Sequence, residues 1–154
     1  MKRELKVSAI KNGTVIDHIT PGKAFEVVRI LGLEDFDSVV SLAIKVSGGK
    51  SEKKDIIKIE NRVLSKEEVD KISLIAPNAT VNIIKGYDVK SKEKVEIPNV
   101  IVGILSCTNK NCITHYEEVK TKFLLENKDP LRIRCYYCER VLNEANIKKA
   151  LEKE

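Results

Sequence analysis

The sequence has few of the residues that most enzymes depend on. Its 154 residues include no Trp, one Met, two His and four Cys. It contains no GxSxG, GxGxxG, HExxH or GxxxxGK[ST] motif, so no familiar pattern places a nucleophile, a base or a phosphate-binding loop. We therefore expect a chain that is not itself an enzyme and has no catalytic residues.

Long apolar runs are also missing. No stretch approaches the roughly 18–20 residues that a membrane-spanning helix needs, and the first residues, MKRELKV, lack the apolar core of a secretory signal. We expect a cytoplasmic protein with no membrane partner. The net charge of +5 is spread along the chain without a basic block, which is a weak indication of nucleic-acid binding.

The four cysteines fall into two close pairs. Cys107 and Cys112 enclose four residues, Cys135 and Cys138 enclose two, and 22 residues separate the pairs. Two short Cys loops separated by a longer gap are typical of a four-thiolate zinc site. Four thiolates complete a tetrahedron, so we predict one structural Zn²⁺ per chain.

Three other interpretations of these cysteines remain open. Two disulfides would require an oxidising compartment. A CxxC redox motif would account for one pair and leave the other without a role. Four cysteines could also hold an iron–sulfur cluster.

The first 98 residues alternate between strand and helix patterns. Ser65 and Glu68 form a capping box that begins a helix ending at Pro77. A second helix is predicted at residues 21–31, with Thr20 as its N-cap, Pro21 at its first position and a left-handed stop at Gly32. Strands are predicted at residues 4–10, 14–19, 38–46 (a buried strand), 55–60, 79–84 and 87–95, with a hairpin turn at Asn12-Gly13.

The resulting order is β-β-α-β-β-α-β-β. Its middle six elements have the order of a ferredoxin-like antiparallel sheet with two helices on one face. Pro98 marks the predicted end of this domain, residues 1–98. Residues 99–154 are expected to form a small all-β zinc-binding domain with a terminal helix at 143–153, and a domain this small commonly needs a metal or a disulfide to fold. The predicted fold class is α+β.

Lysines gather on the predicted strands of the first domain. Lys54 and Lys58 share one strand, and Lys90, Lys92 and Lys94 alternate along another. With Asp17-His18 nearby, such a surface could bind a nucleotide through ammonium–phosphate contacts and a carboxylate on a ribose hydroxyl. The alternative, an ordinary solvated strand surface, stays open at this point.

Several stretches resemble the regulatory chain of aspartate carbamoyltransferase, an enzyme of pyrimidine biosynthesis. They are GTVIDHI at 13–19, KDIIKIENRVLS at 54–65, APNATVNII at 76–84, CTNKNCITH at 107–115 and CYYC at 135–138. They occur in the family's order and span nearly the whole chain.

The resemblance implies a non-catalytic allosteric subunit. Its N-terminal domain would bind CTP and ATP, with UTP as a third effector, and its C-terminal zinc domain would contact the catalytic chain. Regulatory dimers would join catalytic trimers into a dodecamer of six catalytic and six regulatory chains.

Site residues also follow from the resemblance. Asp17 is similar to the residue that binds the ribose, Lys58 to the lysine near base and ribose, and His18 and Lys92 to groups facing the phosphates. Asn109 and Asn111 resemble residues that face the catalytic chain, and the four cysteines match the zinc ligands. The positions that match the pocket around the base are Ala9, Ile10, Val15, Asn82, Ile84, Tyr87 and Val89.

The sequence departs from the family pattern near its start. Glu4 stands where a familiar member has a lysine, and Ser8 where it has a glutamate. The alternative function is a zinc-ribbon protein that binds nucleic acid on its sheet. Such sheets usually carry exposed stacking aromatics, and only Tyr87 is an evident candidate here, which argues against a nucleic-acid partner.

Overall fold

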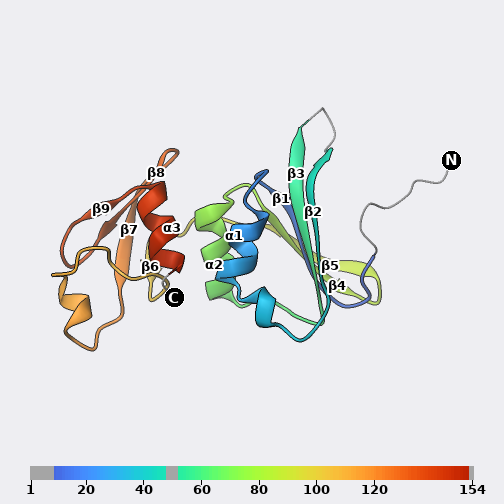
Figure 1. The fold of residues 1–154 in the computed structure, drawn as a ribbon, viewed down its shortest axis with the longest axis horizontal. Helices are drawn as coiled ribbons and strands as arrows, with labels where there is room; N and C mark the ends of the chain where they lie inside the picture. Colours follow the sequence, from blue (N-terminus) through green and yellow to red (C-terminus); the bar gives the residue numbers. More distant parts are fainter. Residues whose placement is uncertain (1–8, 48–51, 153–154) are drawn as a thin grey trace. The chain divides into compact units, whose positions relative to one another are not determined.

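The computed structural model describes residues 9–47 and 52–152. They belong to two compact units, residues 1–95 and 96–154, both drawn in Figure 1. Among the helices in the described part of the chain, none has the length and apolar character to cross a membrane.

The first unit contains a five-stranded sheet with strand order β2-β3-β1-β4-β5, in which all neighbouring strands are antiparallel. The first four strands and both helices have the ferredoxin-like β-α-β-β-α-β order, and β5 adds a fifth strand beside β4. The predicted ferredoxin-like sheet with two helices is confirmed. The elements are β1 (Gly13–Ile19), α1 (Ala24–Ile30), β2 (Val40–Ser47), β3 (Lys53–Glu60), α2 (Lys66–Ile75), β4 (Thr80–Lys85) and β5 (Asp88–Lys94).

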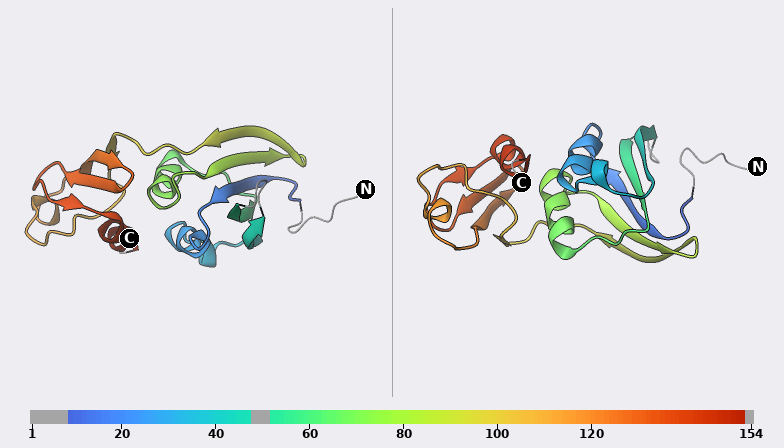
Figure 2. Two further views of the ribbon diagram at one scale, coloured as in Figure 1. Left: turned by 90° about the horizontal axis from the view of Figure 1, so that it is seen from above. Right: turned by 60° about the horizontal axis from the view of Figure 1, so that its bottom comes forward.

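One face of this sheet packs against both helices. Ile16 pairs with Ile57 on β3 and with Val81 on β4, so these side chains share a face. They belong to one buried cluster with Val27 of α1 and Ile72 of α2. The helices lie side by side over this face, as Figures 1 and 2 show. We call the opposite face, which carries Val15, the open face.

The capping box predicted at the start of α2 is confirmed. The Ser65 hydroxyl accepts a hydrogen bond from the Glu68 backbone at 3.2 Å, and the Glu68 carboxylate accepts one from the Ser65 backbone at 3.0 Å. The same carboxylate binds Arg62, whose guanidinium also lies over the Phe36 ring. The start of α2 is therefore held by the hydrogen bonds between Ser65 and Glu68 and by the ion pair with Arg62 in the preceding loop.

Replacing Ser65 with Ala is expected to lower the free energy of unfolding by about 1 kcal/mol, because an N-cap acceptor is lost. Urea denaturation of the full chain, followed by circular dichroism, measures this. Ser47→Ala, at an exposed strand end, is the control and should leave stability unchanged. Equal midpoints for Ser65→Ala and wild type would contradict the prediction.

The predicted start of α1 is wrong. The helix begins at Ala24 after Lys23, which makes no side-chain cap, and Thr20 and Pro21 precede it. Asp55 on β3 takes the role of the cap: its Oδ2 accepts hydrogen bonds from the backbone N–H groups of Gly22 and Ala24, at 3.0 and 3.2 Å. A residue distant in sequence thus replaces the local Thr-Pro signal.

Asp55 also organises β2. Its Oδ1 accepts the backbone N–H of Lys45 at 2.9 Å, at the place where the β2–β3 register shifts and where Lys45 has a φ of 56°. Asp55 is completely buried, with an exposed fraction of 0%. The Asp55 carboxylate on β3 therefore hydrogen-bonds both the backbone at the start of α1 and the backbone of β2 where its register shifts.

Two strand predictions are corrected. β2 was predicted to be a buried strand, but it lies at an edge of the sheet, and Leu42 and Ile44 are 38% and 46% exposed. Tyr87 was predicted to start a strand, but with Gly86 it forms the two-residue turn between β4 and β5, and both residues have positive φ. Such turns match the twist of paired strands.

The Asn12-Gly13 hairpin cannot be compared in full, because residues 4–8 of its first predicted strand lie outside the described residues. The described part, Ala9 and Ile10, is not a strand. Gly13 itself begins β1, with a φ of 143°, and a Cβ there would lie 2.1 Å from the carbonyl oxygen of Ile59. The close approach of β3 therefore requires glycine at this position.

The second unit has a four-stranded antiparallel sheet with order β6-β7-β8-β9 and one helix. Its core contains Phe123, Ile133 and Leu142 from the sheet and Ile147 from the helix, all at most 1% exposed. The prediction of a small all-β unit with a terminal helix is confirmed. Its elements are β6 (Val100–Val102), β7 (Lys122–Lys128), β8 (Leu131–Cys135), β9 (Val141–Leu142) and α3 (Glu144–Glu152).

Candidate functional site

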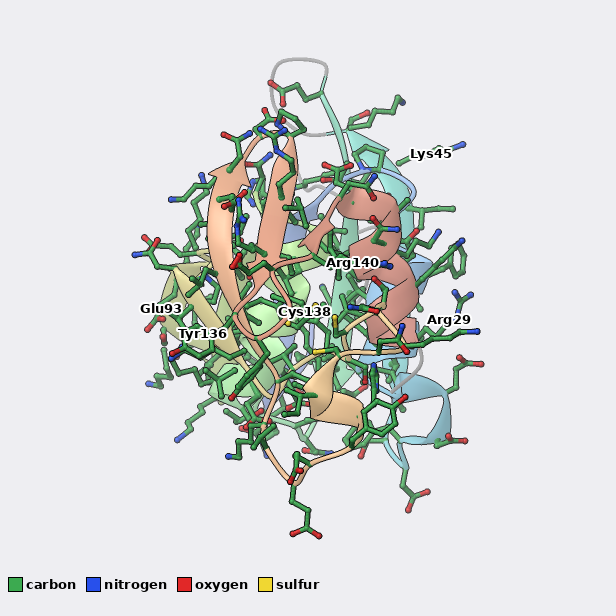
Figure 3. All side chains as sticks on the ribbon, turned by 90° about the vertical axis from the view of Figure 1, so that its left-hand side faces the viewer. Arg29, Lys45, Glu93, Tyr136, Cys138 and Arg140 are labelled. Carbon is green, nitrogen blue, oxygen red and sulfur yellow. The ribbon has the colours of Figure 1, made fainter. Side chains whose placement is uncertain are left out.

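The four cysteines form one cluster. Their sulfur atoms all lie within 4.8 Å of one another, and Figure 3 shows sulfur atoms gathered beside the labelled Cys138. The Cys107–Cys138 and Cys112–Cys135 sulfur distances are 3.6 and 3.7 Å. A tetrahedron with metal–sulfur bonds of about 2.3 Å has edges of about 3.8 Å. The sulfur positions therefore fit a single tetrahedral metal ion.

Two backbone turns bring these sulfurs together. In the first loop, the Cys112 N–H donates to the Asn109 carbonyl at 3.0 Å. In the second, the Glu139 N–H donates to the Cys135 carbonyl at 2.9 Å, at the end of β8. The pairing of β7 with β8 places Phe123 opposite Cys135, so the unit's core supports the second loop.

The surroundings of the sulfurs suit thiolates. The Asn109 N–H lies 3.5 Å from the Cys107 sulfur, and the Thr114 hydroxyl lies 3.2 Å from the Cys112 sulfur. Burial raises the pKa of Cys107 and that of Cys135. Burial also opposes ionisation of Cys138, but hydrogen bonds from the Asn109 side chain and the Arg140 backbone lower its pKa to about 7. N–H and O–H donors directed at sulfur stabilise the charged form that binds metal.

The disulfide alternative does not fit these distances. All four cysteines are free, and a disulfide would require sulfurs about 2.05 Å apart. His115, the nearest candidate for a fifth ligand, has its Nε2 within 2.9 Å of the Cys107 carbonyl oxygen. The imidazole therefore supports the backbone of the first loop.

The sequence analysis did not single out Thr114, whose hydroxyl contacts the Cys112 sulfur. The signal available in the sequence was a hydroxyl residue two positions after a cysteine.

Four of the residues named for the nucleotide site form a row across the open face. Val15 on β1 pairs with Lys58 on β3 and with Asn82 on β4, and Asn82 pairs with Lys92 on β5. Paired residues project from the same face of a sheet. The row thus crosses four adjacent strands, with a lysine at each end and Asn82 beside the centre.

Asp17 and His18 lie two to three positions along β1 from Val15. The Lys54 ammonium is 3.0 Å from the Oδ1 atom of Asp17, and the backbone N–H of His18 donates to the same oxygen at 2.6 Å. His18 has a φ of 57°, and its Nδ1 is 3.3 Å from the Thr80 hydroxyl. His18 lies where the register of β1 with β3 shifts, between Ile16 and Ile19, and its side chain is exposed.

Ile84 and Val89 lie toward the other end of the sheet. They are paired across β4 and β5, and Ile84 is buried whereas Val89 is 58% exposed. Tyr87, in the adjoining turn, is 64% exposed, and its backbone N–H donates to the Lys11 carbonyl at 2.9 Å. Ile10 is buried and Ala9 is exposed, and neither is among the register pairs of the described sheet.

The pKa of Lys58 lies below that of a fully solvated lysine. Partial burial lowers its pKa, and the nearby Asp17 carboxylate opposes this effect. Because desolvation disfavours an ammonium group, an additional anion on the open face would stabilise its charged form. The residue is therefore suited to contact an anionic ligand.

Comparisons with known proteins agree with this architecture. A family model described as the aspartate carbamoyltransferase regulatory chain, allosteric domain, matches residues 5–96. A second, described as the metal binding domain of the same chain, matches residues 99–148.

Named relatives match over nearly their full length. The aspartate carbamoyltransferase regulatory chain of Pyrococcus furiosus is 58% identical over 146 residues, covering 94% of this chain and 96% of the relative. The corresponding chain of Methanococcus aeolicus is 56% identical over 149 residues, covering 97% and 96%, and that of Thermoplasma volcanium is 51% identical over 148 residues, covering 95% and 97%. The chain therefore belongs to the family of aspartate carbamoyltransferase regulatory chains, which are regulatory and not catalytic, and it has the allosteric and metal-binding domains of that family.

Proposed function

We propose that the open face of the first unit binds pyrimidine and purine nucleotides, CTP and ATP with UTP as a third candidate, and that binding controls a separate catalytic chain. The observation that carries this proposal is the row Lys58, Val15, Asn82 and Lys92 across four strands. It combines two cationic groups, an amide and an apolar side chain within one sheet surface, as a nucleotide requires.

Each polar residue of the surface has a distinct role in this proposal. The Lys92 ammonium and the His18 imidazole bind the phosphates as donors. The Asp17 carboxylate, positioned by Lys54 at 3.0 Å, accepts a ribose hydroxyl, and Lys58 lies close to the base and ribose. The Asn82 amide donates to the Val15 carbonyl at 3.2 Å, so its Oδ1 remains the acceptor for an exocyclic amino group.

The base is proposed to occupy the apolar part of this surface. Exposed side chains of Tyr87 and Val89, together with Ala9, Ile10, Val15 and Ile84, would provide the contacts. Aromatic and aliphatic side chains suit the flat faces of a base, with the polar groups fixing its orientation. Glu4 and Ser8, outside the described residues, are two positions at which effector preference could differ from that of relatives.

We further propose that the metal is one structural Zn²⁺ per chain. Four thiolates are the commonest ligands of structural zinc, and they leave no open coordination position. Zinc thiolates also require reduced cysteines, which supports a cytoplasmic location. When bound, the ion would supply only cross-linking and charge, and Cys107, Cys112, Cys135 and Cys138 would hold it.

The zinc domain, residues 99–154, is proposed to contact the catalytic chain through the loop that contains Asn109 and Asn111, and residues 1–98 to be the effector-binding domain. Regulatory dimers would connect catalytic trimers in an assembly of six catalytic and six regulatory chains. A nucleotide regulates such an assembly only if its affinity differs between the assembly's states. Binding to the open face must therefore be energetically linked to the metal domain.

Calorimetric titration of the full chain with CTP and with ATP tests the nucleotide site. Lys58→Ala and Lys92→Ala should each weaken binding about 10–100-fold, because a charge-assisted contact contributes about 1.5–3 kcal/mol. Lys128→Ala, at an exposed position of the other unit, is the matched control and should bind as wild type does. Binding that is absent in wild type, or unchanged in both variants, would overturn the proposed site.

A further inference from the structure

The proposed base subsite is made from two segments that the sheet does not join. Ala9 and Ile10 precede β1, and among the described residues neither has a register partner in the sheet. Tyr87 lies in the turn between β4 and β5, and Val89 lies in β5. A flat base can contact both segments at once only if they are held at a fixed separation. The hydrogen bonds of Asn12 provide this link.

Asn12 binds the β4–β5 turn through its side chain. Its Oδ1 accepts the backbone N–H of Gly86 at 3.2 Å, and the carbonyl of the preceding residue, Lys11, accepts the N–H of Tyr87 at 2.9 Å. Two consecutive N–H groups of the turn therefore bind two consecutive residues before β1. Figure 1 shows the turn and this segment at the same end of the sheet.

Asn12 is itself held against β3. Its carbonyl accepts the N–H of Asn61, the residue after β3, at 2.9 Å. The next residue, Gly13, lies so close to β3 that a Cβ would be 2.1 Å from the Ile59 carbonyl oxygen. The backbone at Asn12 is therefore fixed relative to the strand that carries Lys58, and the side chain of Asn12 connects the turn to that strand.

The turn has little else to hold it in place. Tyr87 is 64% exposed, and Gly86 and Asn12 are exposed as well. Segments with few buried contacts are the ones that open most easily. A hydrogen bond at an exposed position also contributes little to overall stability, because water replaces it readily. Loss of the Asn12 side chain would therefore leave the fold intact and release the turn that carries the Tyr87 ring.

We infer that Asn12 is a positioning residue of the nucleotide site, whose Oδ1 holds the β4–β5 turn so that Tyr87 contacts the base bound beside Ile10. The inference rests on the proposed function and extends it to a residue outside the proposed contact surface. Asn12 acts through the turn and not through a contact with the nucleotide. Its effect on binding therefore depends on the presence of the Tyr87 ring.

Two charged substitutions separate this role from simple electrostatics. Asn12→Asp keeps an acceptor for the Gly86 N–H and adds a negative charge, whereas Asn12→Lys has no acceptor and adds a positive charge. Charge alone would make the lysine variant bind an anionic nucleotide more tightly and the aspartate variant less tightly. The positioning role predicts the opposite order, because only the aspartate retains the hydrogen bond to the turn.

Calorimetric titration of the full chain, with whichever of CTP and ATP binds the wild type more tightly, measures this order. Binding should weaken about 3–10-fold in Asn12→Lys and in Asn12→Ala, and stay within about twofold of wild type in Asn12→Asp. Asn78→Ala, which removes an exposed asparagine before the other end of β4, is the matched control and should bind as wild type does. The Asp–Lys comparison decides the outcome if the alanine variant does not fold.

Two further measurements show whether Asn12 acts through the turn. Hydrogen exchange of the Gly86 amide, followed by NMR, should be faster in Asn12→Ala than in wild type and Asn12→Asp. In a Tyr87→Ala background, Asn12→Ala should weaken nucleotide binding no further, because the ring that it positions is absent. A structural effect unrelated to Tyr87 would instead add to the loss.

The outcomes separate this inference from the proposal beneath it. The role of Asn12 alone is overturned if wild type and Asn12→Ala bind equally, if Asn12→Lys binds more tightly than Asn12→Asp, or if the two alanine effects add in full. A folded wild-type chain that binds neither CTP nor ATP would overturn the nucleotide site and the role of Asn12 with it.

Discussion

Removal of the metal is expected to unfold residues 96–154 while residues 1–95 stay folded. The second unit has a short four-stranded sheet and one helix, a core too small to stabilise itself easily. A structural zinc site contributes on the order of 10–16 kcal/mol in small domains. The first unit has its own buried cluster from five strands and two helices, so it does not depend on the ion.

Two-dimensional NMR of the full chain distinguishes the two units residue by residue. After metal removal, or in Cys112→Ala, the resonances of β6 to β9 should collapse to the narrow range of an unfolded chain, and those of β1 to β5 should persist. Restoring zinc to the wild-type chain should restore its spectrum, which is the control. Retention of the dispersed β6–β9 resonances after verified metal loss would contradict the prediction. A chain treated in this way should also separate from its catalytic partner.

Replacing Asp55 with Ala is expected to lower the free energy of unfolding of the first unit by about 3–5 kcal/mol. The substitution leaves the N–H groups of Gly22, Ala24 and Lys45 without their acceptor. Each unsatisfied buried donor costs about 1–3 kcal/mol, although water entering the vacated space would offset part of the total. The effect combines the loss of an α1 cap with the loss of support for β2.

Thermal and urea unfolding of the full chain, monitored through the resonances of the first unit, measure this effect. Asp55→Asn retains one acceptor oxygen and the residue's volume, so it should cost less than Asp55→Ala. Asp37→Ala, at an exposed loop position, is the matched control and should change stability by less than about 0.5 kcal/mol. Identical stability of Asp55→Ala and Asp37→Ala would show that the buried carboxylate has no structural role.

Local signals in the sequence predicted the features that depend on neighbouring residues. The Ser65–Glu68 capping box is reciprocal and needs only four residues, and the structure contains it. The two cysteine pairs needed only their spacing to indicate one metal site. Gly32 also has the left-handed conformation, with a φ of 64°, that its position after a helix predicted.

Features that depend on distant residues could not be predicted in this way. Thr20-Pro21 is a good local start for a helix, but Asp55, more than 30 residues later, supplies the acceptor that sets where α1 begins. The apolar composition of β2 suggested burial because nothing in its own sequence reveals that it is an edge strand. Alternation placed the lysines on strand faces, but the alignment of Lys58 with Lys92 depends on the strand order of the complete sheet.

The central place of β1 has a consequence for how the chain folds during synthesis. β1 is the first strand of the described sheet to be made, yet its partners are β3 and β4, and the hydrogen bond from Asn82 to Val15 spans 67 residues. Such non-local pairing slows folding. One edge of β1 therefore stays open until β3 leaves the ribosome and the other until β4 does, and until then the nascent chain exposes an unpaired strand edge with which other chains can pair.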